Sequence, residues 1–148
     1  MSVTIDRLKD SDKADWRRLY NGYAAFYKMP MTDETAERVW GWLHDAEHVQ
    51  EALVARDATG RVIGLAHFRA MPSPLRGAYA GFLDDLFVDP DVRGSGAADK
   101  LLDALNAIAA ERGWPVIRWI TADNNYRARG VYDRKATRSM WITYEMKP

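Results

Sequence analysis

The residues best suited to chemistry in this chain lie in one glycine-rich stretch, Arg93 to Ala98, which follows an apolar run ending at Val88. Gly94 and Gly96 carry no Cβ atom, so the backbone around Ser95 can approach a ligand closely. A helical pattern begins directly afterwards, and the first N–H groups of a helix have no partner within it. Together with the helix dipole, these groups favour a phosphate or pyrophosphate. The stretch therefore predicts an anion site between a strand and a helix.

Two common phosphate-binding loops fit this stretch poorly. A Walker loop needs Gly-Lys-Ser/Thr at its end, whereas Gly96 is followed here by Ala97-Ala98. A dinucleotide-binding loop needs Gly or Ala where this chain has Asp99, and an acidic residue on the next strand, which the expected strand 116–121 lacks. A loop that only turns the chain is the plain alternative.

The spacing Arg93-x-x-Gly96-x-Ala98 resembles the acetyl-CoA-binding signature of the GNAT superfamily of N-acetyltransferases, Arg/Gln-x-x-Gly-x-Gly/Ala. The run at 86–90, Leu-Phe-Val-Asp-Pro, is similar to the family's strand leading into that loop. Segments 83–88 and 131–136 are most similar to the branch acting on small amines, which includes acetyltransferases of polyamines, D-amino acids and histone tails. Three residues match the family's downstream pattern, namely Asn125, Ala128 and Tyr132.

The resemblance implies a place for each part of acetyl-CoA, which would act as co-substrate. The backbone of Leu86, Phe87 and Val88 would pair with the pantetheine arm in the manner of an added strand. Asn125 and Ala128 would lie beside the pantetheine or the acetyl group. The pyrophosphate would be held by the loop residues Arg93, Gly94, Ser95, Gly96, Ala97 and Ala98.

Tyr132 occupies the family's general-acid position, where its hydroxyl would protonate the leaving thiolate. Its plain alternative is a packing tyrosine on a short helix. A basic run at 127–138 is interpreted either as attraction for the cofactor's 3′-phosphate or as a solvated surface. One departure from the family stands just beyond Tyr132, where Ala136-Thr137 replaces the usual Gly-Phe turn.

Two neighbouring carboxylates, Asp84 and Asp85, precede the loop and belong to an expected strand. Strict alternation would place Asp84 on one face with Phe82 and Leu86, and Asp85 on the other with Leu83 and Phe87, unless a bulge intervenes. A carboxylate among apolar neighbours is costly unless it is paired or functional. The resemblance implies that Asp84 is the candidate catalytic base or amine anchor, because the polyamine-acetylating relatives carry a Glu at this place. An ion pair to Arg69 is the alternative.

The acceptor amine is expected to meet Tyr27, Asp84, Asp85 and His67. Aromatic faces can hold an alkylammonium group by cation–π contact, and Tyr27 lies in an aromatic-rich helical stretch. His67 stands in the middle of an expected strand, where a hydrogen-bonded structural histidine is the alternative role.

These residues need an α/β framework to position them. Hydrophobic periodicity predicts the element order β-α-α-β-β-β-α-β-α-β and a mixed, mostly antiparallel sheet. The resemblance adds that two central parallel strands splay apart around the cofactor. The pattern favours helices over about 11–29, 32–44, 97–112 and 126–135, and strands over 3–8, 51–56, 61–71, 78–88, 116–121 and 137–146.

Composition limits the class of protein. The 148 residues suit a single domain, 1–148, and the formal net charge of zero gives no global attraction for nucleic acid or for an anionic membrane. The chain has no cysteine, so disulfides and a thiol nucleophile are excluded. Without a basic N-terminal region or a long apolar run, we expect a cytoplasmic protein with no membrane partner.

The function predicted from these patterns is an acetyl-CoA-dependent N-acetyltransferase moving an acetyl group to a small primary amine by direct attack. Alternatives are a protein-tail N-acetyltransferase and a non-catalytic acyl-CoA sensor on the same fold. His44 and His48 fit a zinc-peptidase pattern if they share a helix face, but solvated histidines are favoured and no metal is expected. The last strand would expose an edge, which is compatible with a homodimer.

Overall fold

The computed structural model describes residues 2–148 and contains a five-stranded mixed sheet in the order β1-β2-β3-β4-β5. The first four strands pair antiparallel, and β4 pairs parallel with β5. The strands are β1 (Thr4–Arg7), β2 (Gln50–Arg56), β3 (Val62–Ser73), β4 (Ala78–Val88) and β5 (Ile117–Arg118).

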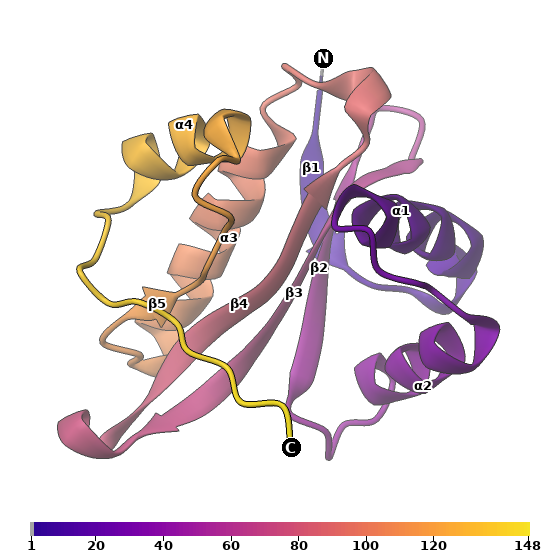
Figure 1. The fold of residues 1–148 in the computed structure, drawn as a ribbon. Coiled ribbons are helices and arrows are strands. Elements are labelled where there is room, and N and C mark those ends of the chain that lie inside the picture. Colours follow the sequence, from indigo (N-terminus) through magenta and orange to yellow (C-terminus); the bar gives the residue numbers. More distant parts are fainter. Residues whose placement is uncertain (1) are drawn as a thin grey trace.

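Four α-helices cover the two faces of this sheet. The helices are α1 (Lys13–Phe26), α2 (Asp33–Leu43), α3 (Ala97–Arg112) and α4 (Tyr126–Lys135). Figure 1 shows α1 and α2 on one face, and α3 with α4 on the other. The predicted α/β class, the mixed sheet and the order of the first nine elements are confirmed.

Alternation along the strands divides the apolar core between these faces. Leu53 and Ala66 point to the α3 face, whereas Val54 and Leu65 point to the α1–α2 face. The α3 face buries a cluster built around Phe68, Leu83, Leu101, Leu105 and Trp114. The other face buries Trp16, Leu19, Ala36, Val39 and Val62. Because each face supports its own helices, the sheet is a rigid platform for residues at its strand ends.

β4 and β5 separate soon after they meet. Their register includes only Gly81 with Ile117 and Phe82 with Arg118, so β5 is shorter than the predicted strand 116–121. Gly81 is required at this junction, since a Cβ atom there would lie 2.6 Å from the Trp114 ring. Beyond the junction, the end of β4 faces the start of α4 with no strand between them.

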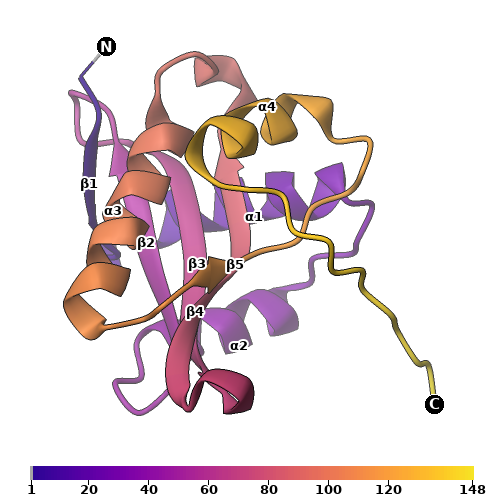
Figure 2. The ribbon, with the colours of Figure 1, turned by 90° about the vertical axis from the view of Figure 1, so that its left-hand side faces the viewer.

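The predicted last strand, 137–146, is wrong. Residues 136–148, called here the C-terminal arm, form no strand or helix within the described chain. The chain leaves α4 at Ala136 in an extended conformation, with φ −149° and ψ 178°. Figure 2 shows the arm running away from the domain body. Alternating residues satisfy the local preference for a strand, but a strand also needs a neighbour for its N–H and C=O groups.

Candidate active site

A cavity of about 470 Å³ lies where β4 has separated from the α4 side of the molecule. One wall is the end of β4, another is α4 with the residues before it, and α1 contributes aromatic side chains. Its lining includes nine residues singled out from the sequence: Tyr27, Leu86, Phe87, Val88, Arg93, Ala98, Asn125, Ala128 and Tyr132. The structure therefore brings three separate sequence segments together around one space.

The glycine loop turns the chain from β4 into α3. Gly94 has φ 85° and Gly96 has φ 82°, in the left-handed region that favours glycine, and the space beside both is open. Asp89 shapes the turn by accepting hydrogen bonds from the Asp91 N–H at 3.0 Å and from Arg18 at 2.7 Å. Hydrogen bonds from Arg18 and the Asp91 backbone outweigh burial and lower the pKa of Asp89.

Gly94, Ser95 and Gly96 form the turn, and α3 begins at Ala97. Arg93 before the turn and Ala98 after it line the cavity. The Ala97 N–H donates to Ser95 Oγ at 3.3 Å. α3 is a 16-residue helix, and Ala98 in its first turn lines the cavity. Its first turn offers N–H groups and a positive dipole end to an anion.

Tyr132 lies on α4 and faces the cavity. Its ring packs edge-on against Trp119, with 5.4 Å between ring centroids. Burial, together with the proximity of Tyr27, raises the pKa of Tyr132 to about 12. The hydroxyl therefore keeps its proton at neutral pH, as a proton donor must.

Asn125 also has a structural task. Its side chain caps α4 by accepting from the Ala128 N–H at 3.5 Å, and its amide donates to Thr121 Oγ1 at 3.4 Å. The Asn-to-Ala spacing of three that marked the sequence motif is thus also the spacing of an N-cap contact. Asn125 both starts the helix that carries Tyr132 and lines the cavity.

A β-bulge in β4 rearranges the two carboxylates. Phe68 faces Leu83 and His67 faces Asp85 in the register, so Asp84 is an extra residue without a partner. Strict alternation is therefore wrong here. Leu83 packs with the α3-face cluster, whereas Asp84 and Asp85 both make their contacts on the α1–α2 face. A bulge shows no clear sequence signal in this strand, which is why alternation alone misplaced the faces.

Asp84 forms an ion pair with Arg69, which was the alternative to a catalytic role in the sequence analysis. Its carboxylate accepts from Arg69 Nε at 3.1 Å and from Gln50 Nε2 at 3.0 Å. Arg69 in turn stacks over the Phe82 ring at 4.8 Å. The Asp84 side chain is 27% exposed, so one side of the carboxylate still meets solvent.

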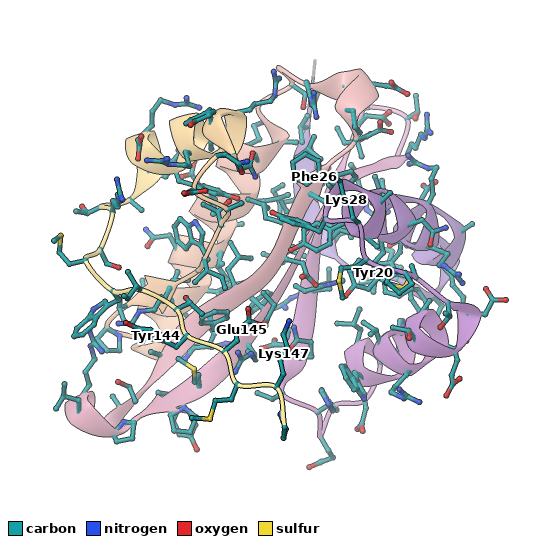
Figure 3. All side chains as sticks on the ribbon, viewed as in Figure 1. Tyr20, Phe26, Lys28, Tyr144, Glu145 and Lys147 are labelled. Carbon is teal, nitrogen blue, oxygen red and sulfur yellow. The ribbon has the colours of Figure 1, made fainter. Side chains whose placement is uncertain are left out.

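Asp85 belongs to a buried hydrogen-bond chain. Trp16 Nε1 donates to His67 Nε2 at 3.0 Å, and His67 Nδ1 lies 2.7 Å from Asp85 Oδ2. An indole N–H can only donate, so His67 Nε2 must accept and the ring proton must sit on Nδ1, facing Asp85. Tyr20 donates to the same carboxylate oxygen at 3.2 Å. Figure 3 labels Tyr20 on α1.

The charge on Asp85 is held by these donors. Burial favours the neutral acid, but hydrogen bonds from His67, Tyr23 and Tyr20 outweigh it and lower the pKa of Asp85. Conversely, burial first and the Asp85 charge second raise the pKa of Tyr20 and of Tyr23. The arrangement is therefore a fixed anion surrounded by neutral donors.

Phe26 and Trp16 were not singled out as site residues from the sequence, and Tyr23 was only one of several aromatic residues of the early helices that could meet the acceptor. Tyr23 and Phe26 line the cavity, and Trp16 fixes the orientation of His67. All three follow the helical spacing of α1, which is equally typical of core residues, so their spacing carried no distinguishing signal. Tyr23 links the two halves of the site, since it lines the cavity and also donates to the Asp84 carbonyl at 3.4 Å.

The basic run divides into two groups. Arg127 joins Arg93 at the cavity, which gives the cavity wall two guanidinium groups. Arg134 pairs with Asp99 at 3.2 Å and Lys135 with Asp103 at 2.8 Å, so these two fasten α4 to α3. Part of the basic run 127–138 therefore forms ion pairs between α4 and α3.

His44 and His48 do not share a helix face, because α2 ends at Leu43. His44 Nδ1 lies 2.8 Å from the Trp40 carbonyl oxygen, while His48 stacks on Trp42 with 4.9 Å between ring centroids. Within residues 2–148, no three His, Cys, Asp or Glu side chains gather as metal ligands. The same residues include no helix with the length and apolarity needed to cross a membrane.

Residues 16–136 match the family model described as the acetyltransferase (GNAT) family. The chain belongs to this family, and its enzyme class is that of the N-acetyltransferases. It is 25% identical over 144 residues to a D-amino-acid N-acetyltransferase of Saccharomyces cerevisiae, covering 97% of this chain and 89% of that protein.

Solved structures agree with this assignment. A ribosomal-protein-alanine N-acetyltransferase from Brucella melitensis biovar Abortus 2308 has 29% identity, a TM-score of 0.84 and 99% coverage of both chains. A structure of AAC(6')-Iy in complex with the bisubstrate analogue CoA-S-monomethyl-acetylneamine has a TM-score of 0.85 at 18% identity, covering 100% of this chain and 99% of that one. At that identity, the second likeness concerns the fold alone.

Proposed function

We propose that the protein transfers the acetyl group of acetyl-CoA to a small primary amine by direct attack. The observation that carries this proposal is that three features line one cavity. They are residues 86–88 of β4, whose edge away from β3 has no strand partner within residues 2–148, the loop before α3, and the protonated Tyr132. Asp85 lies close by as a fixed negative charge, connected to the cavity through Tyr23.

The residues around the cavity fit the parts of acetyl-CoA. Open space beside Gly94 and Gly96, with the N-terminal end of α3, suits a pyrophosphate. Arg93 and Arg127 add positive charge at the wall. When bound, acetyl-CoA supplies the thioester carbonyl that an amine attacks. A β4 backbone N–H group near Phe87 or Val88 would stabilise negative charge developing on the carbonyl oxygen.

Each catalytic group has a separate task in this proposal. Tyr132 donates its proton to the leaving sulfur as the C–S bond breaks and the new C–N bond forms. Asp85, held ionised, attracts the ammonium form of the acceptor toward the site. Asp84, partly exposed beside Arg69, is the proposed acceptor of the proton that the amine must lose, directly or through a water.

A small amine is favoured by the surroundings of Asp85. Tyr20 and Tyr23 place aromatic rings beside the carboxylate, with 6.1 Å between their centroids. Aromatic faces next to a buried anion suit a compact alkylammonium group. The likeness to a yeast D-amino-acid N-acetyltransferase over nearly the whole chain supports the same class. A cytoplasmic location and a homodimer remain predictions.

A protein N-terminus is the second candidate acceptor. It is favoured by the 29% identity to a ribosomal-protein-alanine N-acetyltransferase across 99% of both chains. A peptide acceptor would react only when presented as an α-amine on a chain, whereas a small-amine enzyme would accept the free compound. The two candidates therefore separate in one assay.

The testing experiment is a thiol-release assay with acetyl-CoA and a panel of acceptors. The panel contains polyamines, L- and D-amino acids, arylamines, aminoglycosides, a basic peptide and a peptide beginning with alanine. Free CoA is detected with a disulfide dye, to which this cysteine-free chain adds no background. Turnover on a free small amine is the expected result. Turnover on peptides alone would favour the second candidate, and binding of acetyl-CoA without any turnover would favour a sensor.

A further inference from the structure

His67 has both ring nitrogens occupied in a buried position. The residue is 1% exposed, and its Nε2 atom accepts from Trp16 Nε1 at 3.0 Å. Its Nδ1 atom carries the ring proton and lies 2.7 Å from Asp85 Oδ2. An aspartate beside Nδ1 is also the arrangement of histidines that act as general bases, whose free Nε2 takes a proton from the nucleophile. Because Trp16 occupies that nitrogen, His67 has the tautomer of a general base without the free nitrogen that a base needs.

Protonation of His67 would disrupt this hydrogen-bond chain. The imidazolium ion carries an N–H group on both ring nitrogens. Its Nε2–H would face the indole N–H of Trp16 across 3.0 Å, and two donors cannot form a hydrogen bond with each other. A buried donor without an acceptor is costly, because it loses its hydration and gains no partner in the protein. The indole N–H of Trp16 therefore opposes the charged form of the ring.

Asp85 acts on His67 in the opposite direction. Within residues 2–148, it is the one charged group in hydrogen-bond contact with the His67 ring. A negative charge at 2.7 Å favours the imidazolium ion. A charged His67 would in turn neutralise Asp85, and the pair would then offer no net charge to an ammonium ion. Of the two hydrogen-bond partners of the ring, Trp16 alone opposes this outcome.

The remaining neighbours of His67 in the described part of the chain are neutral or already paired. On β2, its partner in the register is Ala52. From α1, Tyr20, which Figure 3 labels, packs edge-on against the ring with 4.9 Å between centroids, and burial raises the pKa of its hydroxyl. Two residues further along β3, Arg69 is paired with Asp84 at 3.1 Å. The charge of the ring therefore depends on its two hydrogen-bond partners.

We propose that Trp16 is a positioning residue that keeps His67 neutral, and that it thereby keeps the negative charge of Asp85 available to the acceptor as the pH falls. The part that concerns the acceptor rests on the proposed function, whereas the part that concerns His67 rests on its two hydrogen bonds. An ordinary histidine gains its charge between about pH 8 and pH 5. With Trp16 in place, an ammonium ion meets a full negative charge at Asp85 over that whole range.

The first test reads the protons of His67 directly by NMR, in full-length chains labelled with 15N in the imidazole ring. The chain has three histidines, so the pair of substitutions His44→Gln and His48→Gln leaves His67 as the single source of ring signals. The two ring nitrogen shifts distinguish the two neutral tautomers and the imidazolium ion. With Trp16 present, we expect the neutral Nδ1–H tautomer from about pH 8 to about pH 5. A ring that becomes charged in this range, or that carries its proton on Nε2, would overturn the proposal without any further variant.

Trp16→Phe removes the indole donor, and Trp40→Phe is the matched control. Trp40 packs against Trp16 in the same core cluster, with 5.2 Å between ring centroids, but Trp16 and Asp85 already occupy both nitrogens of His67. We expect His67 to become charged between about pH 8 and pH 5 in Trp16→Phe and to stay neutral in Trp40→Phe. A neutral ring in both variants, or a charged ring in both, would contradict a specific role for Trp16.

A kinetic measurement tests the consequence for the acceptor. As the pH falls through the range in which His67 becomes charged, the acceptor KM of Trp16→Phe should rise about tenfold more than that of Trp40→Phe, because the imidazolium ion cancels the charge of Asp85. The same pH dependence of KM in both variants would overturn the role of Trp16 in acceptor binding. If no acceptor of the panel reacts, the proposed function fails, and the NMR result alone supports or overturns the role of Trp16 at His67.

Discussion

At the scale of single residues, the site separates a proton donor from an anion by environment. Tyr132 and Asp85 are both half-buried, yet Tyr132 keeps its proton at neutral pH and Asp85 is ionised. Burial alone stabilises the neutral form of either group. The difference comes from the Nδ1–H of His67, which is aimed at Asp85 because Trp16 occupies the other ring nitrogen.

Tyr132→Phe should lower kcat about 100-fold while leaving the dissociation constant for acetyl-CoA within about twofold, because only proton donation is removed. The raised pKa of about 12 keeps the wild-type hydroxyl protonated as pH rises from 7 to about 10. Wild-type kcat should therefore show no alkaline decline over that range. Initial rates and calorimetric binding check both statements. A Tyr132→Phe variant with the same kcat as the wild type at every pH would remove Tyr132 from the acid role.

Asp85→Asn and Asp84→Asn form a matched pair that should act on different kinetic parameters. Loss of the fixed charge at Asp85 should raise the acceptor KM about 10- to 100-fold. Loss of a proton acceptor at Asp84 should instead lower kcat about 100-fold. Steady-state kinetics with the best acceptor of the panel measure both. The same effect from both variants would contradict the division of tasks proposed here.

At the scale of elements, a buried ion pair joins the start of α1 to the sheet. Arg56 on β2 contacts both carboxylate oxygens of Asp12 at 2.7 Å, and Asp12 is 6% exposed. The hydrogen bond from Arg56 is the main cause of the lowered pKa of Asp12. The contact fixes where α1 begins, and α1 carries Trp16, Tyr20 and Tyr23 to the site.

Asp12→Asn should therefore lower the free energy of unfolding by about 3 kcal/mol at pH 7, since it leaves Arg56 without its buried partner. The folded-state pKa of Asp12 is depressed, so its contribution is full above the unfolded value near 3.8 and is lost as pH falls through the folded value. The deficit of the variant should shrink below pH 3. Urea unfolding at both pH values measures this, with the exposed Asp10→Asn as the control, and an equal deficit at both would contradict it.

Sequence patterns predicted the elements that depend on local signals. β4 at Ala78–Val88 and α4 at Tyr126–Lys135 have the predicted boundaries, because alternation, Pro90 and the Asn125 cap mark their ends. The bulge at Asp84 and the absent last strand depend on neighbours in space, which alternation within one segment does not encode. Eight of the nine predicted residues at the cavity were connected by the family's motifs rather than by periodicity, and the ninth, Tyr27, was predicted from the aromatic-rich helical stretch that holds it.

At the scale of the whole molecule, the cavity lies between the β4 side and the α4 side of the fold, which are connected within the sheet only by the short pairing of β4 with β5. β4 and β5 share a two-residue register, and beyond it the β4 end and α4 meet across the cavity. A ligand that contacts both walls would therefore connect the β4 side to the α4 side. Such a ligand stabilises the folded chain by mass action.

CoA at 100 times its dissociation constant should stabilise the protein by about 2.7 kcal/mol. For a chain of this size, that corresponds to a rise in Tm of roughly 5–10 °C. Gly96→Val, which forces a branched side chain into a backbone with φ 82°, should lose most of this rise. Thermal unfolding with and without CoA measures the rise for each protein against its own baseline. An equal rise in both, or none in the wild type, would contradict a CoA site at this loop.

The bulge in β4 also has a consequence for insertions and deletions. Loss of one residue within a strand ordinarily shifts the remainder by one position and turns its buried side chains toward solvent. Asp84 has no partner in the register, so its removal would leave Leu83 opposite Phe68 and Asp85 opposite His67, as they already are. Because Asp84 and Asp85 are identical neighbours, deletion of either codon gives the same chain, in which both core faces of β4 keep their residues. The deletion removes one of the two carboxylates, so we expect it to lower the activity more than the stability of the fold.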